Sequence, residues 1–444
     1  MKKLLILSAL IFVTNFYSQS WDYVGDAGFS ISDANYLSMD IDLQSNDIFV
    51  GYQDIGDEGK LSISSLEYGT SDWVNVNNGL SNGYANYNSL SIDSNGNPYY
   101  SFIDGDGDTI NFGYLSDNGN WGTQNPSNGG NIPGHSINSV VKQDYDGDVF
   151  VCSYHFSWRI VLYRAGSFGS GFSINNSFPD GNISSLSFDI KYNSGYVAFS
   201  NLDDEGKIDI SKVDGGNISV LETYDNVSDG LSNSLDLKIN PFTLEPYIAF
   251  QDIGNAGKLT VKKLSGDSWE LVGAESISEG IANDISLAFN QSGVPYVAFK
   301  DVSFSNKLSV MSFDGDNWSY VGERGISSGA ASYPSIKINS NDEVYVAFKD
   351  GSVSNKASVM KFNIGLSINS NSNLVTSINP NPSSKYINVN IDSELEAVVF
   401  DLLGKELIRE NITGRLDISS LEKGTYILNL IDGLNTSTHK IIKE

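Results

Sequence analysis

The feature that most constrains the fold is a short segment that recurs seven times along the chain. Each copy is an apolar run that ends in a polar residue, as in Val297–Asp301. The polar residues that end the copies are spaced 50, 51, 46, 51, 49 and 49 residues apart. They are Asp54, Asp104, His155, Asn201, Asp252, Asp301 and Asp350. Self-similarity at a fixed period indicates an array of one supersecondary unit.

The sixth copy shows how the unit is built. Turn residues separate four predicted strands, which are Ile285–Asn290, Val294–Lys300, Lys307–Phe313 and Trp318–Gly322. The second strand is apolar on consecutive residues, as expected of a strand that is covered on both faces. Because a four-stranded unit with a period of about 49 residues is typical of propeller blades, the sequence predicts an all-β, seven-bladed β-propeller.

The last copy is one strand short. Its third strand ends at Lys356–Phe362, and no Trp-x-x-Val-Gly segment follows it. That segment stands near the N-terminus instead, as Trp21–Gly25. We therefore expect Trp21–Gly25 to complete the seventh blade, since a ring closed in this way leaves no open sheet edge.

The N-terminal 20 residues have the pattern of a secretory signal peptide. Lys2 and Lys3 form a charged start, Leu4–Val13 is a short apolar stretch, and Ser18–Ser20 offers small residues for cleavage before Trp21. The sequence thus predicts a signal peptide at residues 1–20 and a propeller at residues 21–363.

The C-terminal part has a different composition. Residues 364–377 are rich in Ser and Asn and read as a linker. Short strands are predicted beyond it, at Tyr386–Ile391, Ala397–Leu402, Thr425–Ile431 and His439–Ile442. We expect residues 378–444 to form a small Ig-like β-sandwich.

Five motifs in this part stand in a fixed order. They are Asn379–Pro382, Val398–Lys405, Leu416–Leu421, Gly424–Tyr426 and Lys440–Lys443. Residues 378–444 closely resemble the C-terminal sorting domain of the type IX secretion system of Bacteroidetes. The resemblance implies the secretion machinery as a partner, passage across the outer membrane, and removal of the domain. The cargo would then be extracellular or anchored at the outer-membrane surface. The alternative is an accessory β-domain that binds a ligand.

Composition excludes several functions. The chain has 27 Lys and Arg against 54 Asp and Glu, a net charge of −27, which argues against binding nucleic acid or anionic membranes. Its single cysteine, Cys152, excludes a disulfide framework and a cysteine-based zinc site, and we expect it to be a small core residue. No apolar stretch after the N-terminus is long enough for a transmembrane helix.

One loop of the repeat carries charged residues at both ends. An acid or amide and a lysine stand six residues apart in Asp54/Lys60, Asn201/Lys207, Asp252/Lys258, Asp301/Lys307 and Asp350/Lys356. We interpret these as cross-strand ion pairs at the base of the loop. The alternative is a ring of carboxylates that binds Ca²⁺ or sugar hydroxyls.

The sequence offers one candidate metal site. Asp104, Asp106 and Asp108 alternate with glycines and supply only oxygen ligands, which suits Ca²⁺. The segment lacks the bidentate glutamate of a full EF-hand loop, so a plain turn is the alternative. No other cofactor is expected.

Three tyrosines share one place in the repeat. Tyr36, Tyr87 and Tyr333 each stand two residues before the serine that opens the innermost strand of a blade. This places them near the mouth of the central channel, where a tyrosine can stack on a sugar ring. The alternative is that they pack beneath the connecting loops.

The third copy breaks the pattern. Where other copies have Asp and Lys, it has His155-Phe156-Ser157-Trp158-Arg159, and His135 lies in the connection that enters the same blade. In an active site, a histidine would act as general base, Arg159 would hold a carboxylate, Tyr154 would donate or stack, and Trp158 would contact the ligand. The alternative is drift in a decayed repeat.

These observations favour a binding protein over an enzyme. The repeats are nearly uniform, their tyrosines stand at positions expected to be exposed, and the chain has few catalytic groups. This combination indicates a secreted or cell-surface propeller with a carbohydrate or protein ligand. The alternative is a polysaccharide lyase or glycoside hydrolase with its site near the third blade. Propellers host both of these enzyme classes, but that is an analogy at the level of the fold. The identity of the ligand, bound calcium, oligomeric state, and the choice between release and anchoring stay open.

Overall fold

A computed structural model describes residues 19–105, 109–115, 121–124, 136–144, 147–155, 159–165, 172–175, 178, 182–364, 378–389, 395–401, 405–432 and 435–444. The chain divides into two compact units. We call Ser20–Asn363 the ring unit and the unit that contains Ile364–Glu444 the tail unit. The two are described separately. The predicted signal peptide and linker lie almost entirely outside the described residues.

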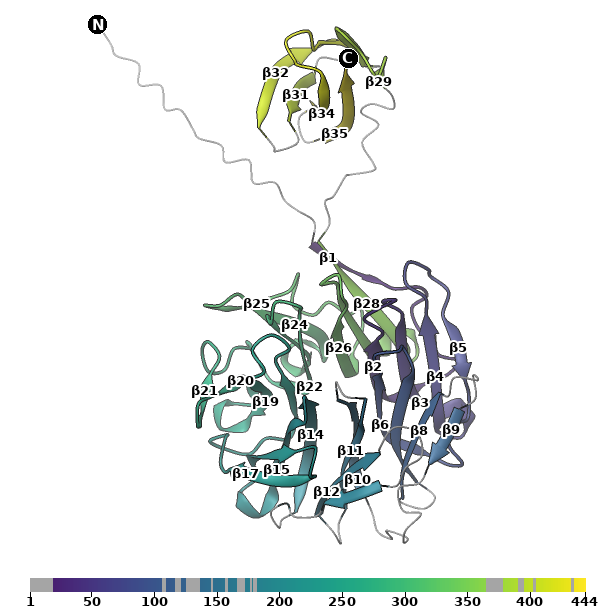
Figure 1. Ribbon diagram of the computed structural model, residues 1–444, viewed down its shortest axis with the longest axis vertical. Helices are drawn as coiled ribbons and strands as arrows, with labels where there is room; N and C mark the ends of the chain where they lie inside the picture. Colours follow the sequence, from purple (N-terminus) through teal and green to yellow (C-terminus); the bar gives the residue numbers. More distant parts are fainter. Residues whose placement is uncertain are drawn as a thin grey trace, which may run out of the picture. The chain divides into compact units, whose positions relative to one another are not determined.

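The described part of the ring unit consists of seven four-stranded antiparallel sheets (Figure 1). The first sheet contains β2 (Ala34–Ile41), β3 (Ile48–Asp54), β4 (Lys60–Leu66) and β5 (Val74–Asn77), and the second contains β6 (Ala85–Ile92), β7 (Pro98–Asp104), β8 (Thr109–Leu115) and β9 (Trp121–Gln124). The third contains β10 (Ser136–Gln143), β11 (Val149–His155), β12 (Arg159–Ala165) and β13 (Phe172–Asn175). The fourth contains β14 (Ile183–Lys191), β15 (Ser194–Asn201), β16 (Lys207–Asp214) and β17 (Ser219–Tyr224). The other three are β18 (Leu235–Ile239), β19 (Pro246–Asp252), β20 (Lys258–Ser265), β21 (Ser268–Leu271); β22 (Ala282–Phe289), β23 (Pro295–Asp301), β24 (Lys307–Phe313), β25 (Trp318–Tyr320); and β26 (Ala331–Ile338), β27 (Val344–Asp350), β28 (Lys356–Ile364), β1 (Gln19–Tyr23).

Short 3-10 turns follow the second strand in five of these sheets. They are η1 (Ile55–Asp57), η2 (Leu202–Asp204), η3 (Ile253–Asn255), η4 (Val302–Phe304) and η5 (Gly351–Val353). The all-β prediction with four-stranded antiparallel units is therefore confirmed.

The first strands of neighbouring sheets lie side by side and make the arrangement propeller-like. Contacts run from β2 through β6, β10, β14, β18 and β22 to β26, and β26 also contacts β2. Side chains on these strands bind the backbone of the next sheet: the N–H of Leu90 donates to Ser38 Oγ at 3.0 Å, and that of Met39 donates to Ser335 Oγ at 3.0 Å. The same link is made by Ser89, Ser187, Asp236 and Ser286.

The strand at the N-terminal end of the ring unit completes the last sheet, as predicted. β1 pairs with β28 and becomes the outer strand of the sheet that begins at β26. The backbone N–H of Val24 donates to the carbonyl of Val359 at 2.9 Å. The sheet is thus assembled from the two ends of the ring unit.

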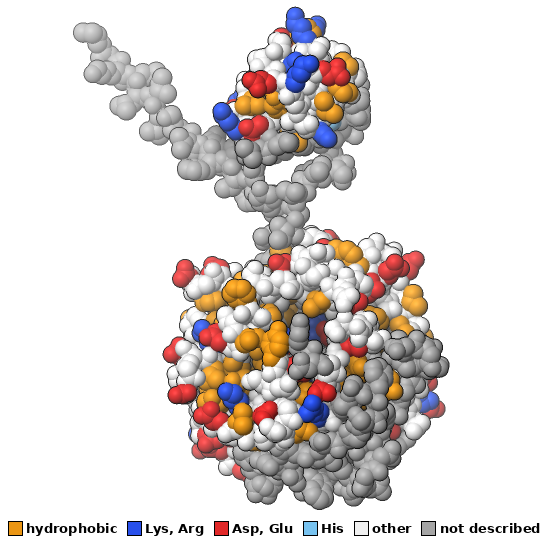
Figure 2. All heavy atoms as spheres, viewed as in Figure 1, with side chains coloured by type: hydrophobic (Ala, Val, Ile, Leu, Met, Phe, Trp, Pro, Cys, Tyr) orange, Lys and Arg blue, Asp and Glu red, His pale blue; other side chains and the backbone are white. Residues whose placement is uncertain are grey.

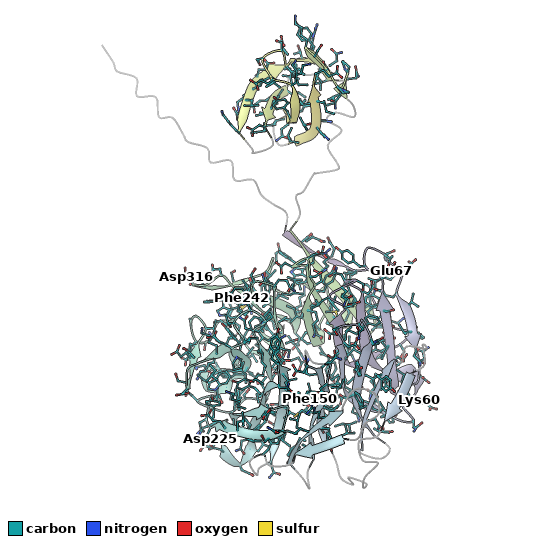
Figure 3. All side chains as sticks on the ribbon, viewed as in Figure 1. Lys60, Glu67, Phe150, Asp225, Phe242 and Asp316 are labelled. Atoms are coloured by element: carbon teal, nitrogen blue, oxygen red, sulfur yellow. The ribbon has the colours of Figure 1, made fainter. Side chains whose placement is uncertain are left out.

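The core lies between the sheets, because each second strand is covered on both faces. Every residue of β19 is buried, and one cluster joins Ala249 of β19 to Leu287 of β22 and Val297 of β23. Cys152 is fully buried, as expected of a small core residue. Figure 3 shows Phe150 in the packed interior, whereas Asp225 and Asp316 lie at the periphery.

The tail unit contains two sheets. One has the order β29 (Ile378–Asn379), β30 (Tyr386–Val389), β33 (Arg415–Asp417), and the other has the order β32 (Glu406–Ile412), β31 (Leu395–Phe400), β34 (Gly424–Asp432), β35 (Asn435–Lys443). They share an apolar core in which Ile387, Leu416, Leu428 and Ile441 are fully buried. The strands expected around 386, 397, 425 and 439 are all present.

Candidate functional site

The three tyrosines predicted to share one place do meet in space. Tyr36 of β2, Tyr87 of β6 and Tyr333 of β26 lie on adjacent innermost strands. The ring centroids of Tyr36 and Tyr87 are 5.0 Å apart, and those of Tyr36 and Tyr333 are 5.3 Å apart. These separations are typical of aromatic contacts. We call these three residues the tyrosine cluster.

A β-bulge places each of these side chains. The bulge in β2 lies between Asn35 and Ser38, and the corresponding bulges recur in β6 and β26. The bulged tyrosines adopt left-handed backbone angles, with φ of 48°, 53° and 52°. Asn138 and Asp284 have the same conformation at the equivalent place of two other sheets, with φ of 60° and 50°. Such residues turn their side chains out of the regular strand alternation, which the sequence pattern alone did not reveal.

The phenol groups of the cluster are open to a ligand. All three tyrosines are half-buried, and none of the described hydrogen bonds uses their hydroxyls. Burial and the neighbouring Tyr87 raise the pKa of Tyr36. Burial, Tyr36 and Asp284 raise the pKa of Tyr333 to about 12. The hydroxyls of Tyr36 and Tyr333 therefore stay protonated at neutral pH and can both donate and accept hydrogen bonds.

The raised pKa values predict an alkaline loss of stability. A phenol whose pKa is higher in the folded protein stabilises it fully below the ordinary pKa near 10, and this contribution is lost as the pH rises from 10 to 12. We expect Tyr333→Phe to remove one phenol that ionises near pH 12, measured by absorbance at 295 nm. Loss of a phenol that ionises near pH 10 would contradict this assignment.

Polar side chains surround the cluster and link neighbouring sheets. Lys349 Nζ donates to Asn35 Oδ1 at 2.7 Å and lies 2.6 Å from Asp33 Oδ1. Gln53 Nε2 donates to Asn86 Oδ1 at 2.9 Å. The amides of Asn35 and Asn86, each next to a cluster tyrosine in sequence, are thus held by Lys349 and Gln53, and polar groups fixed in this way can orient a polar ligand.

The repeated aspartates cap turns and do not form the predicted ion pairs. Asp54 lies opposite Lys60, but its Oδ1 accepts the N–H of Gly56 at 3.0 Å, and Lys60 Nζ lies 3.3 Å from Glu58 Oε2. The same cap forms at Asn201, Asp252 and Asp350. The ion-pair prediction is wrong because the start of a 3-10 turn leaves N–H groups that the carboxylate satisfies. Asp301 makes no such cap and pairs with Arg324 instead. The carboxylates of Asp54, Asp252, Asp301 and Asp350 are buried, and the alternative of a ligand-binding carboxylate ring stays a prediction.

The calcium candidate is only partly visible. Asp104 ends β7, whereas Asp106 and Asp108 lie outside the described residues. Within the part of the chain that the structure describes, no three His, Cys, Asp or Glu side chains are grouped so as to hold a metal ion. The Ca²⁺ site at Asp104 stays a prediction.

The third copy also stays a prediction. The backbones of His155 and Arg159 pair across β11 and β12, while their side chains, His135 and Trp158 fall outside the described residues. Tyr154 is 1% exposed and packs in the core cluster of this sheet, so it is not available to stack on a ligand.

Sequence reasoning missed a group of charges on the innermost strands. Asp40, Lys142, Asp189, Lys238 and Lys337 line one cavity together, at the strand ends opposite the tyrosine cluster. The sequence does contain a signal for them. Each charged residue stands two positions after the serine that opens the innermost strand, or after the residue that replaces this serine in other copies. Within otherwise apolar strands, such residues are placed only where they meet a partner or a channel.

Solved structures share the fold of the chain. The extracellular domain of a hybrid two-component system from B. thetaiotaomicron aligns with a TM-score of 0.50 and 12% identity, over 96% of this chain and 57% of that one. Raptor from Chaetomium thermophilum aligns with a TM-score of 0.51 and 10% identity, over 78% and 29%. An ulvan lyase of polysaccharide lyase family PL25 aligns with a TM-score of 0.47 and 11% identity, over 76% and 94%.

This chain spans little more than half of the first of these proteins and under a third of the second. At 10–12% identity the likeness to these two concerns the fold alone. A comparison with curated protein sequences gives no match. Among the described residues, no helix is long and apolar enough to cross a membrane.

The tail unit matches a known family of domains. A family model described as the secretion system C-terminal sorting domain matches residues 377–444. The match covers the five motifs and the strands from β29 to β35. Residues 377–444 are therefore a C-terminal sorting domain of the type IX secretion system, and the protein is exported to the cell surface or the extracellular space.

Proposed function

We propose that this protein is a secreted or surface-bound lectin-like β-propeller that binds carbohydrate at the tyrosine cluster. In this proposal residues 1–20 are a signal peptide, residues 21–363 a seven-bladed propeller, residues 364–377 a linker and residues 378–444 an Ig-like sorting domain. The ligand-binding part is the propeller, because the sorting domain serves export.

The observation that supports a carbohydrate ligand is the tyrosine cluster itself. Three half-buried rings lie in contact on adjacent strands, and their hydroxyls have no partner among the described residues. A sugar has apolar C–H faces that pack on aromatic rings and hydroxyls that pair with phenol and amide groups. The cluster offers both kinds of contact, and its left-handed backbone fixes the rings before a ligand arrives.

The charge of the protein limits the classes of carbohydrate that it can bind. On the face shown in Figure 2, acidic side chains are spread over the ring unit, and the chain as a whole carries a net charge of −27. Long polyanionic glycans would be repelled by such a surface. A neutral oligosaccharide is the ligand class that fits both the charge and the polar groups around the cluster.

A substitution taken from the protein's own repeats tests this proposal. Tyr36 is the central ring, and Asn138 occupies the equivalent place of the third sheet with the same backbone angle. Tyr36→Asn should therefore fold normally. We expect it to reduce affinity for a bound neutral glycan by about 10- to 100-fold, because each lost stacking and hydrogen-bonding contact contributes about 1–2 kcal/mol. The measurement is a glycan array followed by calorimetric titration of the full chain.

Tyr84→Asn is the matched control. Tyr84 is 54% exposed in the connection that leads into β6 and does not belong to the cluster. It should leave glycan affinity unchanged. Absence of binding to every neutral glycan, or equal loss in both variants, would refute the proposal. Formation of product from a bound glycan would support the lyase or hydrolase alternative, and loss of binding in EDTA would identify calcium as a requirement.

A further inference from the structure

A second site lies at the opposite end of the innermost strands. A cavity of about 560 Å³ is lined by residues of all seven first strands, from Asp40 of β2 to Lys337 of β26. Asp40 stands four residues after Tyr36, which places it roughly 13 Å farther along the strand. The volume is in the range that holds a small organic molecule. This cavity is therefore separate from the tyrosine cluster.

Several charged side chains at the cavity have partners inside the protein. Asp40 Oδ1 lies 2.8 Å from Lys337 Nζ, and its Oδ2 accepts the N–H of Ile92 at 2.9 Å. Asp236 pairs with Lys238, and Asp189 Oδ2 accepts the N–H of Ile239 at 2.8 Å. Each carboxylate thus has a partner.

Lys142 is different. It lines the cavity from β10, and none of the described residues forms a hydrogen bond or ion pair with its ammonium group. Its pKa is lowered to about 8, first by burial and then by the ammonium groups of Lys337 and Lys238, whose effect exceeds that of Asp189 and Asp40. Lys142 thus presents an ammonium group to the cavity without a partner among the described residues.

The walls indicate what kind of anion would fit. Ile92, Ile190, Ile239 and Ile338 contribute apolar surface, and Gln143 and Gln291 contribute amides. Five aspartates line the same cavity and would repel a second negative charge on the ligand; they are Asp40, Asp42, Asp93, Asp144 and Asp189. A ligand with one negative charge on a hydroxylated carbon skeleton satisfies all of these groups.

We propose that this cavity binds a small hydroxylated monocarboxylate, with its carboxylate on Lys142. The ammonium group supplies the charge-assisted hydrogen bond that the site otherwise lacks. The isoleucines pack against the carbon skeleton, and the glutamine amides pair with its hydroxyls. The ligand would be a sugar acid or a similar molecule, and its binding is independent of the tyrosine cluster.

Calorimetric titration of the full chain with D-glucuronate tests this proposal, with D-glucose and inorganic phosphate as comparison probes. We expect glucuronate to bind, and Lys142→Met to weaken it by about 10- to 100-fold, which corresponds to a hydrogen bond to a charged group. Lys142→Arg keeps the charge and should stay within about threefold of the wild type. Because Lys142→Met removes an unpaired charge from a confined site, it should raise the melting temperature without ligand.

Several results would overturn the proposal. Absence of glucuronate binding to the wild type would overturn it, and so would equal glucuronate affinity of Lys142→Met and the wild type. Glucose binding as tightly would exclude a role for the carboxylate. Phosphate binding more tightly would show that the cavity selects a dianion, which the flanking aspartates should reject. If glucuronate does not bind in this cavity, the glycan-binding test of the tyrosine cluster is unaffected.

Discussion

Replacing Arg324 with methionine is expected to lower the free energy of unfolding of the ring unit by about 3–5 kcal/mol. Asp301 is fully buried. Arg324 donates two hydrogen bonds to the Asp301 carboxylate, from Nε to Oδ2 at 2.7 Å and from Nη2 to Oδ1 at 3.0 Å. The variant leaves that carboxylate buried without its counter-charge. Urea unfolding followed by tryptophan fluorescence measures the effect, since all six tryptophans belong to the ring unit and none to the tail.

Two variants separate this explanation from general damage. Glu279→Gln removes the exposed partner of Arg324 and should cost less than about 1 kcal/mol. Asp301→Asn combined with Arg324→Met should recover much of the lost stability, because Asn201 already occupies this place in the fourth sheet. Equal destabilisation by Arg324→Met and Glu279→Gln would contradict the role of the buried carboxylate.

Replacing Trp21 with alanine should lower the free energy of unfolding by about 3 kcal/mol. Trp21 packs on Phe362 with ring centroids 5.4 Å apart, and its Nε1 donates to the carbonyl of Val321 in the neighbouring sheet at 2.7 Å. Trp73 and Trp318 make the same bond at other sheet boundaries. At the closing strand this contact holds the two ends of the ring unit together, so its loss should also open β1 to hydrogen exchange.

Matched phenylalanine variants divide packing from hydrogen bonding. Trp21→Phe keeps a ring against Phe362 and loses only the bond to Val321, so it should cost about 1 kcal/mol. Trp269→Phe should be neutral, because the Trp269 Nε1 is buried without a hydrogen-bond partner. If Tyr23 to Gly25 exchanged in the wild type as fast as a free tail, the closing role of β1 would be refuted.

The repeat made the sheets predictable, since apolar second strands and turn residues recur at nearly constant spacing. The closing strand was also predictable, because a missing segment at one end of the array was present at the other. Strand starts were less accurate: β22 begins at Ala282, three residues before the expected Ile285. A bulge between Asn283 and Ser286 disrupts the alternation there, and sequence patterns do not reveal a bulge.

The candidate site was predictable only in part. The shared position of Tyr36, Tyr87 and Tyr333 placed them on one surface, but their mutual contacts depend on left-handed bulges. Turn capping by Asp54 was missed, because an Asp and a Lys six residues apart fit an ion pair equally well on paper. Lys142 was missed because the charged residues around it come from strands about 50 to 200 residues away in sequence.

The pairing of β1 with β28 has a consequence for the order of biogenesis. The strand at the start of the ring unit finds its neighbour only when Lys356–Ile364 has been synthesised, just before the sorting domain. Until then the last sheet lacks both β28 and β1, so β27 has an unpaired edge, and such a long-range pairing forms late in folding. Both the last sheet and the sorting domain therefore depend on synthesis of the chain from Lys356 onward, so a chain truncated before this residue would carry neither a complete last sheet nor a sorting domain.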